Sequence, residues 1–429
     1  MPNSCSELPT PIRQTLRALV AIGLFWSWSS TLTWGANWPQ FRGPTGQGLA
    51  DAAPVPTVWN ERKNIAWKTP LEGRGHSSPV VWGTQVWLTT ASTDGKRLGA
   101  IGLDRMTGEV IHTVAVFAPT SLEEIHADNT FASPTPVITE GRLYVDFGTY
   151  GVACIDTDSG QVLWRNQSLR CEHQGGPGSS PVLFEETLIV HRDGADQQFV
   201  AALDIKNGRI RWRRDRSAPF RENPITHRAF ASPLLYEHQG RTLLISPAAD
   251  QCHAYDAATG EELWHVRYIG FSNVPCPVAV GDHVYICTGF FSPELRSVRL
   301  GGSGDVTESH VEWAYKAQIP DVSSPILVDG RIYFVSTKGV LSCVDAATGD
   351  RIYIHRLGGN FSASPLFAGG LLYFCNKEGV TKVVRPGEDH EIISSNKLDD
   401  GIHASPIAVD GALYIRTETH LYRIEEEQP

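Results

Sequence analysis

The sequence lacks the residue patterns that mark thiolate metal sites, redox thiols and nucleic-acid binding. No two of its eight cysteines are adjacent and no pair has C-x-x-C spacing, so zinc ribbons and thioredoxin-type chemistry have no support. No block of five or more basic residues occurs, and the net charge is −10. The basic footprint of a nucleic-acid binder is therefore missing, and we expect no nucleic-acid partner.

Long apolar runs are also absent, except near the N-terminus. There, Arg13 and Arg17 precede an apolar stretch from 18 to 34, followed by the small residues Gly35 and Ala36. This order is typical of a secretory signal and predicts export to the periplasm or cell envelope. We expect residues 1–36 to be a signal peptide or, if uncleaved, an N-terminal anchor that makes the only membrane contact.

The remaining seven cysteines divide into two groups by their surroundings. Four lie inside apolar alternating runs, which predicts buried core thiols: Cys154, Cys287, Cys343 and Cys375. In an oxidising compartment Cys171, Cys252 and Cys276 could form one disulfide, and the sequence leaves the pairing open.

What the sequence does contain is an internal repeat. A small residue, then Ser-Pro, then alternating β-branched residues recurs, with Cys276-Pro277 as a degenerate copy. The serines of the other copies are Ser78, Ser133, Ser180, Ser232, Ser324, Ser364 and Ser405. The mean step of about 47 residues matches one four-stranded propeller blade.

A second phrase follows each Ser-Pro: Asp, two residues, Thr or Ser, Gly, and an aromatic residue four positions later. The aspartates are Asp104, Asp156, Asp204, Asp256 and Asp345, and in the first copy the aromatic position holds His112. Asp can accept backbone N–H bonds at the start of a tight turn, and Gly supplies the positive φ that finishes it. We expect the aromatic residue to lie on the outer strand and fill the wedge between blades.

These repeats predict an all-β fold, an eight-bladed β-propeller of four-stranded antiparallel blades. The last unit, 405–424, has residues for only three strands, and the segment 64–68 looks like a lone outer strand. An N-terminal strand completing the last blade would pair both open sheet edges. We therefore expect an irregular strap at 37–63 and a single propeller at 64–429.

The two phrases together resemble the repeats of pyrroloquinoline quinone (PQQ) dependent dehydrogenases and of the BamB-type assembly lipoproteins. The opening Trp38-Pro39-Gln40-Phe41-Arg42-Gly43 also resembles secreted PQQ-like repeat proteins of planctomycetes. The resemblance implies the propeller fold. For function it implies two alternatives, a cofactor-dependent oxidoreductase or an envelope assembly protein.

Two departures from these families bear on the alternatives. Quinoprotein alcohol dehydrogenases carry adjacent cysteines over the cofactor, and this sequence has none. The assembly lipoproteins need a lipidated cysteine after the signal, and none lies near Ala36. We therefore expect no cofactor, with PQQ and calcium as the alternative.

In a propeller the loop before each innermost strand faces one mouth of the central channel. Imidazole and carboxylate groups recur in these loops, and we take them as candidate cofactor- or ligand-binding residues: His76, His126, Asp128, His173, His227, Asp321 and His403. No pair has the close spacing of a metal site, and exposed loops are polar by default.

The sequence favours a non-catalytic binding or scaffolding protein at the cell envelope, with a protein or envelope polymer as partner. The alternative is a PQQ-dependent alcohol or sugar dehydrogenase with Asp128 or Asp321 as base. No catalytic residue is assigned.

Overall fold

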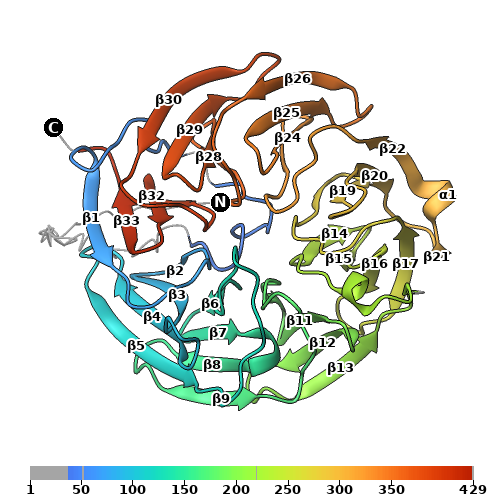
Figure 1. Ribbon diagram of the computed structural model, residues 1–429, viewed down its shortest axis with the longest axis horizontal. Helices are drawn as coiled ribbons and strands as arrows, with labels where there is room; N and C mark the ends of the chain where they lie inside the picture. Colours follow the sequence, from blue (N-terminus) through green and yellow to red (C-terminus); the bar gives the residue numbers. More distant parts are fainter. Residues whose placement is uncertain (1–36, 51–52, 219, 428–429) are drawn as a thin grey trace, which may run out of the picture. The chain divides into compact units, whose positions relative to one another are not determined.

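The computed structural model describes residues 37–50, 53–218 and 220–427. The predicted signal peptide or anchor, 1–36, lies outside the described residues. Residues 35–429 form one compact unit. Within its described part, eight antiparallel sheets are arranged as the blades of a ring, which confirms the predicted eight-bladed propeller (Figure 1).

The first four blades each run from an innermost to an outer strand. They are β2 (Val80–Trp82), β3 (Gln85–Ala91), β4 (Leu98–Asp104) and β5 (Val110–Phe117); β6 (Val137–Thr139), β7 (Arg142–Asp146), β8 (Val152–Asp156) and β9 (Val162–Asn166); β10 (Val182–Phe184), β11 (Thr187–Asp193), β12 (Gln198–Asp204) and β13 (Ile210–Asp215); and β14 (Leu234–His238), β15 (Arg241–Pro247), β16 (Gln251–Asp256) and β17 (Glu262–Arg267). Short helices η1 (Gly148–Tyr150) and η2 (Pro224–His227) lie in their loops.

The last four blades follow the same order. They are β18 (Val278–Val280), β19 (His283–Cys287), β20 (Leu295–Arg299) and β22 (Val311–Tyr315); β23 (Ile326–Val328), β24 (Arg331–Val335), β25 (Val340–Asp345) and β26 (Arg351–Arg356); β27 (Leu366–Ala368), β28 (Leu371–Cys375), β29 (Val380–Arg385) and β30 (Glu391–Lys397); and β31 (Ile407–Val409), β32 (Ala412–Arg416), β33 (His420–Ile424) and β1 (Ile65–Pro70). In blade 5 a longer loop with β21 (Gly304–Asp305) and α1 (Thr307–His310) replaces the tight turn, and β21 pairs with β17 of blade 4.

The ring closes as predicted, because β1 pairs with β33 and completes blade 8. In Figure 1 the blue strand β1 lies beside the red strand β33. The second and third strands of each blade are mostly buried, whereas an outer strand such as β9 alternates between half-buried and exposed residues. The core therefore lies between blades, which explains the alternation in the sequence.

The predicted Asp-x-x-Thr/Ser-Gly turns are confirmed. A side-chain oxygen of the aspartate accepts backbone N–H bonds of the turn in each copy: Asp104, Asp156, Asp204, Asp256 and Asp345. The turn residue Gly260 has a φ of 69°, and a Cβ there would lie 2.6 Å from the ring of Trp212 in the preceding blade. The aromatic residue of one blade thus covers the turn of the next, and in the first blade His112 takes this place over Gly160.

The Ser-Pro phrase joins the innermost strands into a ring. The backbone N–H of one copy donates to the side-chain hydroxyl of the next in six such bonds among the described residues. The donors are Ser78, Thr135, Ser180, Cys276, Ser324 and Ser364. The serine is therefore a link between blades, a role that the sequence pattern did not reveal.

One position of this phrase was predicted wrongly. In blade 2 the link is Thr135, followed by Pro136 and then β6, two residues after the predicted Ser133-Pro134. The sequence there is Ser133-Pro134-Thr135-Pro136, so two pairs of a hydroxyl residue and a proline follow each other directly. The hydroxyl of Ser133 donates to Asn129 inside its own loop, at 2.5 Å.

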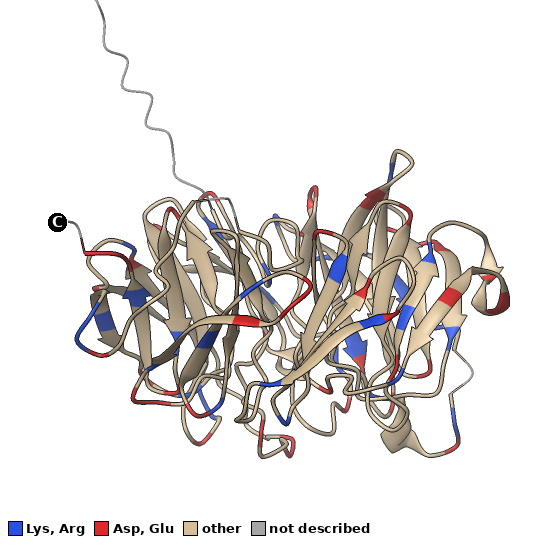
Figure 2. Ribbon diagram, turned by 90° about the horizontal axis from the view of Figure 1, so that it is seen from above, with Lys and Arg blue, Asp and Glu red and all other residues tan. Residues whose placement is uncertain are grey.

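All seven cysteines that the structure describes are free and buried. This confirms the core thiols at Cys154, Cys287, Cys343 and Cys375, and the open disulfide among Cys171, Cys252 and Cys276 is not formed. Within the described ranges, no helix has the length and apolar character needed to cross a bilayer. Positive and negative side chains are interspersed around the unit (Figure 2).

Candidate functional site

The propeller has two unlike faces. Because the strands of a blade are antiparallel, the Asp-x-x-Thr-Gly turns and the first-to-second-strand turns lie on one face, which we call the strap face. The connections into each innermost strand and the second-to-third-strand turns lie on the opposite face, the loop face. The predicted site residues lie in connections of the loop face.

Residues 37–50 run across the strap face and bond to the innermost strands. Main-chain or side-chain bonds from this segment reach Val81 in β2, Ile138 in β6, Ala279 in β18 and Phe367 in β27. The guanidinium of Arg42, 3% exposed, donates to the carbonyl of Pro325 just before β23 at 2.7 Å. This segment therefore ties blades 1, 2, 5, 6 and 7 together.

On the loop face the structure brings three of the predicted residues into one neighbourhood. The rings of His76 and His403 stack with centroids 4.4 Å apart and an interplanar angle of 3°. Lys377, in the turn between β28 and β29, reaches Asp128 at 3.1 Å. His403 lies 3.2 Å from Glu418. These side chains come from five different connections between strands, and we call them, together with Arg416, the basic cluster.

Burial and neighbouring positive charge keep His76 neutral. Its pKa falls to about 2, first because of burial and then because of His403, Arg416, Arg74 and Lys377 around it. The pKa of His403 is also lowered by burial and by Lys377, against the opposing effect of Glu418. The two imidazoles are therefore neutral near pH 7.

His126 and His173 lie in a second part of the face, formed by the connections into blades 2 and 3. The backbone N–H of His126 donates to the carbonyl of Gly175. His173 is buried, its Nε2 lies 3.6 Å from the Cys171 sulfur, and burial lowers its pKa to about 3. A cavity of about 570 Å³ opens beside them, lined by Glu123, Glu124, Ile125, His126, Glu172, Gln174 and Gly175.

His227 and Asp321 take part in local bonds at other positions. His227 Nε2 lies 2.6 Å from the carbonyl oxygen of Arg221, within the same connection. Asp321 accepts a hydrogen bond from the Thr337 hydroxyl at 3.1 Å, within blade 6. The seven predicted residues thus fall into separate groups, and the first holds His76, Asp128 and His403.

The described side chains form no ready-made site for calcium, the ion that would accompany PQQ. Calcium takes six to eight oxygen ligands, and among the described residues no three His, Cys, Asp or Glu side chains gather as a metal site. In the basic cluster the two carboxylates are already paired, Asp128 with Lys377 and Glu418 with His403.

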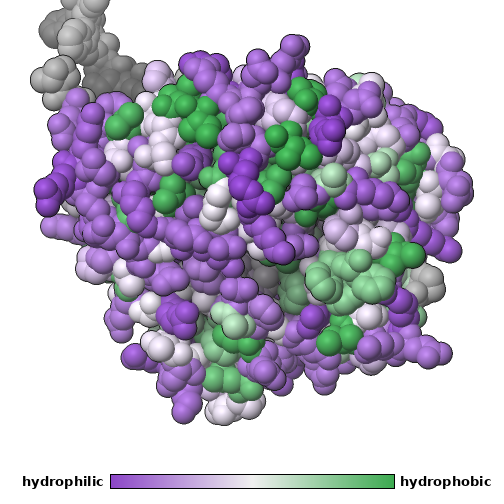
Figure 3. Space-filling view, turned by 45° about the horizontal axis from the view of Figure 1, so that its top comes forward, coloured by the Kyte–Doolittle hydropathy of each residue, from purple (hydrophilic) through white to green (hydrophobic). Residues whose placement is uncertain are grey.

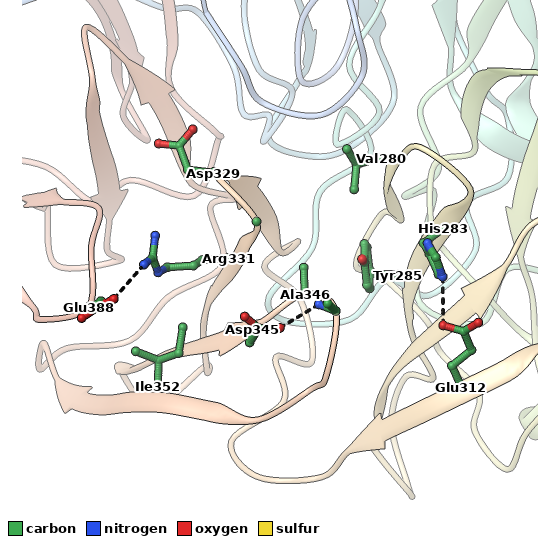
Figure 4. Close-up of a pocket in the computed structure, with 12 residues that line it drawn as sticks. Val280, His283, Tyr285, Glu312, Asp329, Arg331, Asp345, Ala346, Ile352 and Glu388 are labelled. Atoms are coloured by element: carbon green, nitrogen blue, oxygen red, sulfur yellow. Dashed lines mark hydrogen bonds and ion pairs between the residues drawn. The ribbon is translucent and has the colours of Figure 1, made fainter.

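Another cavity, of about 920 Å³, lies between blades 5 and 6 (Figure 4). Its acidic side chains have partners: Glu312 lies 2.9 Å from His283, and Glu388 lies 3.4 Å from Arg331. Asp345 accepts bonds from its own turn. The acidic side chains of this cleft therefore already bond to groups of the protein, and we assign the cleft no ligand.

The loop face also carries an aromatic patch that sequence analysis missed, formed by Arg221, Ile269, Phe271, Phe290 and Phe291. The Phe271 ring lies 5.8 Å from that of Phe290 and 6.5 Å from that of Phe291. The Arg221 guanidinium lies over the rings of Phe271 and Phe291 at 5.4 and 5.9 Å. The adjacent phenylalanines Phe290 and Phe291, which lie between β19 and β20, were the available sequence signal.

Comparison with protein families gives one match. The model described as outer membrane protein assembly factor BamB matches residues 150–385 and, overlapping, 238–428, which together span more than half of the chain. A curated relative, tetrathionate hydrolase of Acidithiobacillus ferrooxidans, is 21% identical over 266 residues. That match covers 55% of this chain and 50% of the relative, so the chain spans about half the length of the relative.

Solved structures show the same fold. BamB from Moraxella catarrhalis is similar with a TM-score of 0.58 and 15% identity, covering 84% of this chain and 99% of that chain. Quinohemoprotein alcohol dehydrogenase from Comamonas testosteroni is similar with a TM-score of 0.63 and 11% identity, covering 92% of this chain and 81% of that chain. At such identities the likeness extends to the fold alone.

Proposed function

The chain belongs to the family of outer membrane protein assembly factor BamB, the PQQ-like β-propellers, and from this premise we propose that it is a non-catalytic binding or scaffolding protein. In this proposal it is exported to the periplasm or cell envelope, and its loop face binds a protein partner. Membership of a family with an assembly factor supports protein binding in general.

The observation that carries the proposal is the aromatic patch. Exposed fractions reach 61% for Ile269, 56% for Phe290 and 68% for Phe291. Aromatic and arginine side chains supply most hot spots of protein interfaces, and clustered exposed apolar side chains are unusual on a monomer. Apolar surface also gathers in separate patches on the side of the unit drawn in Figure 3.

The backbone supports this assignment. Phe291 has a φ of 90°, a strained conformation that bulky residues rarely adopt. By contrast, other exposed apolar side chains such as Val110, Leu163 and Ile210 stand on outer strands. The alternation of an outer strand explains those residues, and it does not explain the patch.

The oxidoreductase alternative finds little support in the side chains present. Among the described residues no three His, Cys, Asp or Glu side chains form a metal site, and the two carboxylates of the basic cluster are paired. The cysteines that the structure describes form no disulfide.

The partner test compares a patch variant with a matched outer-strand control. The tagged parent is cross-linked in the source cells, and the envelope proteins it captures are quantified. We expect F290D/F291D to capture at least tenfold less of these proteins. L163D, at 46% exposure on β9, should capture the same proteins as the parent. Equal capture by F290D/F291D and the parent would contradict the proposed surface.

Two further measurements test the remaining parts of the proposal. Calorimetry and visible absorption with PQQ and calcium should show neither heat nor a chromophore, whereas saturable binding near one equivalent would replace the proposal with the oxidoreductase. Fractionation should recover the chain outside the cytoplasm, and an exclusively cytoplasmic chain would refute export.

A further inference from the structure

Arg416, the last residue of β32, is a buried guanidinium whose described neighbours include no paired carboxylate. It is 2% exposed. Its Nη1 donates to the carbonyl and hydroxyl oxygens of Ser77 at 3.1 and 2.7 Å and to the carbonyl of Thr89 at 3.0 Å. Through these bonds it joins blade 8 to blade 1. All three accepting oxygens bond to Nη1, one of the three nitrogens of the guanidinium.

The other side of the guanidinium is unmatched. Nε is buried without a hydrogen-bond partner among the described residues, and none of them receives a bond from Nη2. Nη2 lies against the backbone of Gly75, where a Cβ would come within 2.5 Å of it. Nε is enclosed by the protein, so Nη2 is the nitrogen left to donate to a carboxylate oxygen.

Of the groups around Arg416, Lys377 adds positive charge and the two histidines are neutral. His76, next to Gly75 in sequence, stacks on His403, and Lys377 stands beside them with 20% of its side chain exposed. The two nearby carboxylates already have partners, because Asp128 pairs with Lys377 and Glu418 pairs with His403. An uncompensated buried charge is costly, so an anion reaching Arg416 would be stabilised strongly.

We propose that the basic cluster is a carboxylate-binding site in which Nη2 of Arg416 donates to the carboxylate and Lys377 attracts it. His76, neutral near pH 7, would donate its N–H to the bound group, whereas the single N–H of neutral His403 already bonds to Glu418 and leaves its ring to pack against His76. The carboxylate belongs either to a free small organic acid or to an acidic side chain of a peptide. This site is separate from the aromatic patch and stands without it.

The electrostatics of His76 agree with this site. The charged side chains that act on its imidazole are Arg416, Arg74 and Lys377, all positive, and the neighbouring His403 adds to their effect. Burial alone lowers the pKa of Arg416, to about 9, with no carboxylate acting on it. A bound carboxylate would therefore raise the pKa of His76.

The test is NMR titration of the histidine ring signals with succinate, with the neutral succinamide as the control ligand. We expect saturable shifts of the His76 and His403 signals with succinate alone. A glutamate-rich, C-terminally amidated octapeptide distinguishes the two sources. Tighter binding of the peptide than of succinate assigns a protein partner, and equal or weaker binding assigns a small acid.

Three variants make the outcome decisive. R416Q should weaken succinate binding at least tenfold and K377Q about threefold, whereas K338Q, in the corresponding turn of blade 6, should leave it unchanged. No saturable shift with either probe, or unchanged binding in R416Q, would overturn the proposal. If R416Q does not fold, K377Q decides, and a dissociation constant equal to that of the parent overturns it. Loss of partner capture in F290D/F291D has no bearing on these results.

Discussion

The strap face and the loop face are built from the same eight sheets but from opposite kinds of sequence. The strap face repeats itself, with an Asp-x-x-Thr/Ser-Gly turn in four blades, a variant with Asn207 in a fifth, and an aromatic residue of the preceding blade over each turn. The loop face differs from blade to blade: the connection into blade 2 holds Asp128, and that into blade 5 holds Phe271. Repetition here follows the needs of packing, and irregularity marks the surface available for binding.

The largest loss of stability is expected from a change in the segment 37–50 on the strap face. Trp38 is 2% exposed, pairs with Val81 and packs against Gly43. We expect W38A to lower the free energy of unfolding by about 3–5 kcal/mol, the cost of emptying a buried tryptophan site. Urea denaturation measures this, and a loss below about 1 kcal/mol would show that the strap is not part of the packed core.

The turn glycines come next. In G260V a β-branched side chain would adopt a φ of 69° and meet the Trp212 ring, for a loss of about 3 kcal/mol. G240V is the matched control, because Gly240 has a φ of 76° and no atom near its missing Cβ. It should lose about 1 kcal/mol. Equal melting temperatures for the two variants would contradict the role of Trp212.

The loop face should make stability depend on pH through His173. Its pKa in the folded chain, about 3, lies below the usual 6.5, first because of burial and then because of Arg192. Between pH 6.5 and 3 the unfolded chain binds the extra proton, so stability falls as pH falls. H173N should reduce the slope of the free energy of unfolding against pH by up to about 1.4 kcal/mol per pH unit. Urea denaturation at several pH values measures this slope. An unchanged slope would mean that protonation of His173 is not linked to unfolding.

The smallest change in stability is expected in the aromatic patch. F290D/F291D should unfold within about 0.5 kcal/mol of the parent, because both side chains are more than half exposed. Thermal unfolding followed by circular dichroism checks this. A larger loss would show that the patch packs the fold and would undermine its use as a binding surface.

The repeat made the fold predictable. Ser-Pro and Asp-x-x-Thr-Gly mark the two ends of a blade, and their spacing yields the number of blades and the closing strand. The one displaced anchor, Ser133 instead of Thr135, arose where the motif stands twice in tandem. Local pattern cannot choose between two copies two residues apart, whereas the hydrogen bond to the next blade can.

The candidate site was less predictable, because its members come together only in three dimensions. The loop position indicated His76 and His403, and the structure stacks them. Nothing in the sequence near Arg416 or Lys377 distinguishes them from other basic residues. Arg416 matters because it is buried without a paired carboxylate among its described neighbours, and burial depends on the packing of blade 8 against blade 1.

The pairing of β1 with β33 has a consequence for the order of synthesis. The first strand of the ring finds its partner only after the last blade has been made. Until then both edges of the growing array expose unpaired backbone groups, which favours aggregation. The β1–β33 pairing therefore makes each terminal strand a point at which the whole array can be opened.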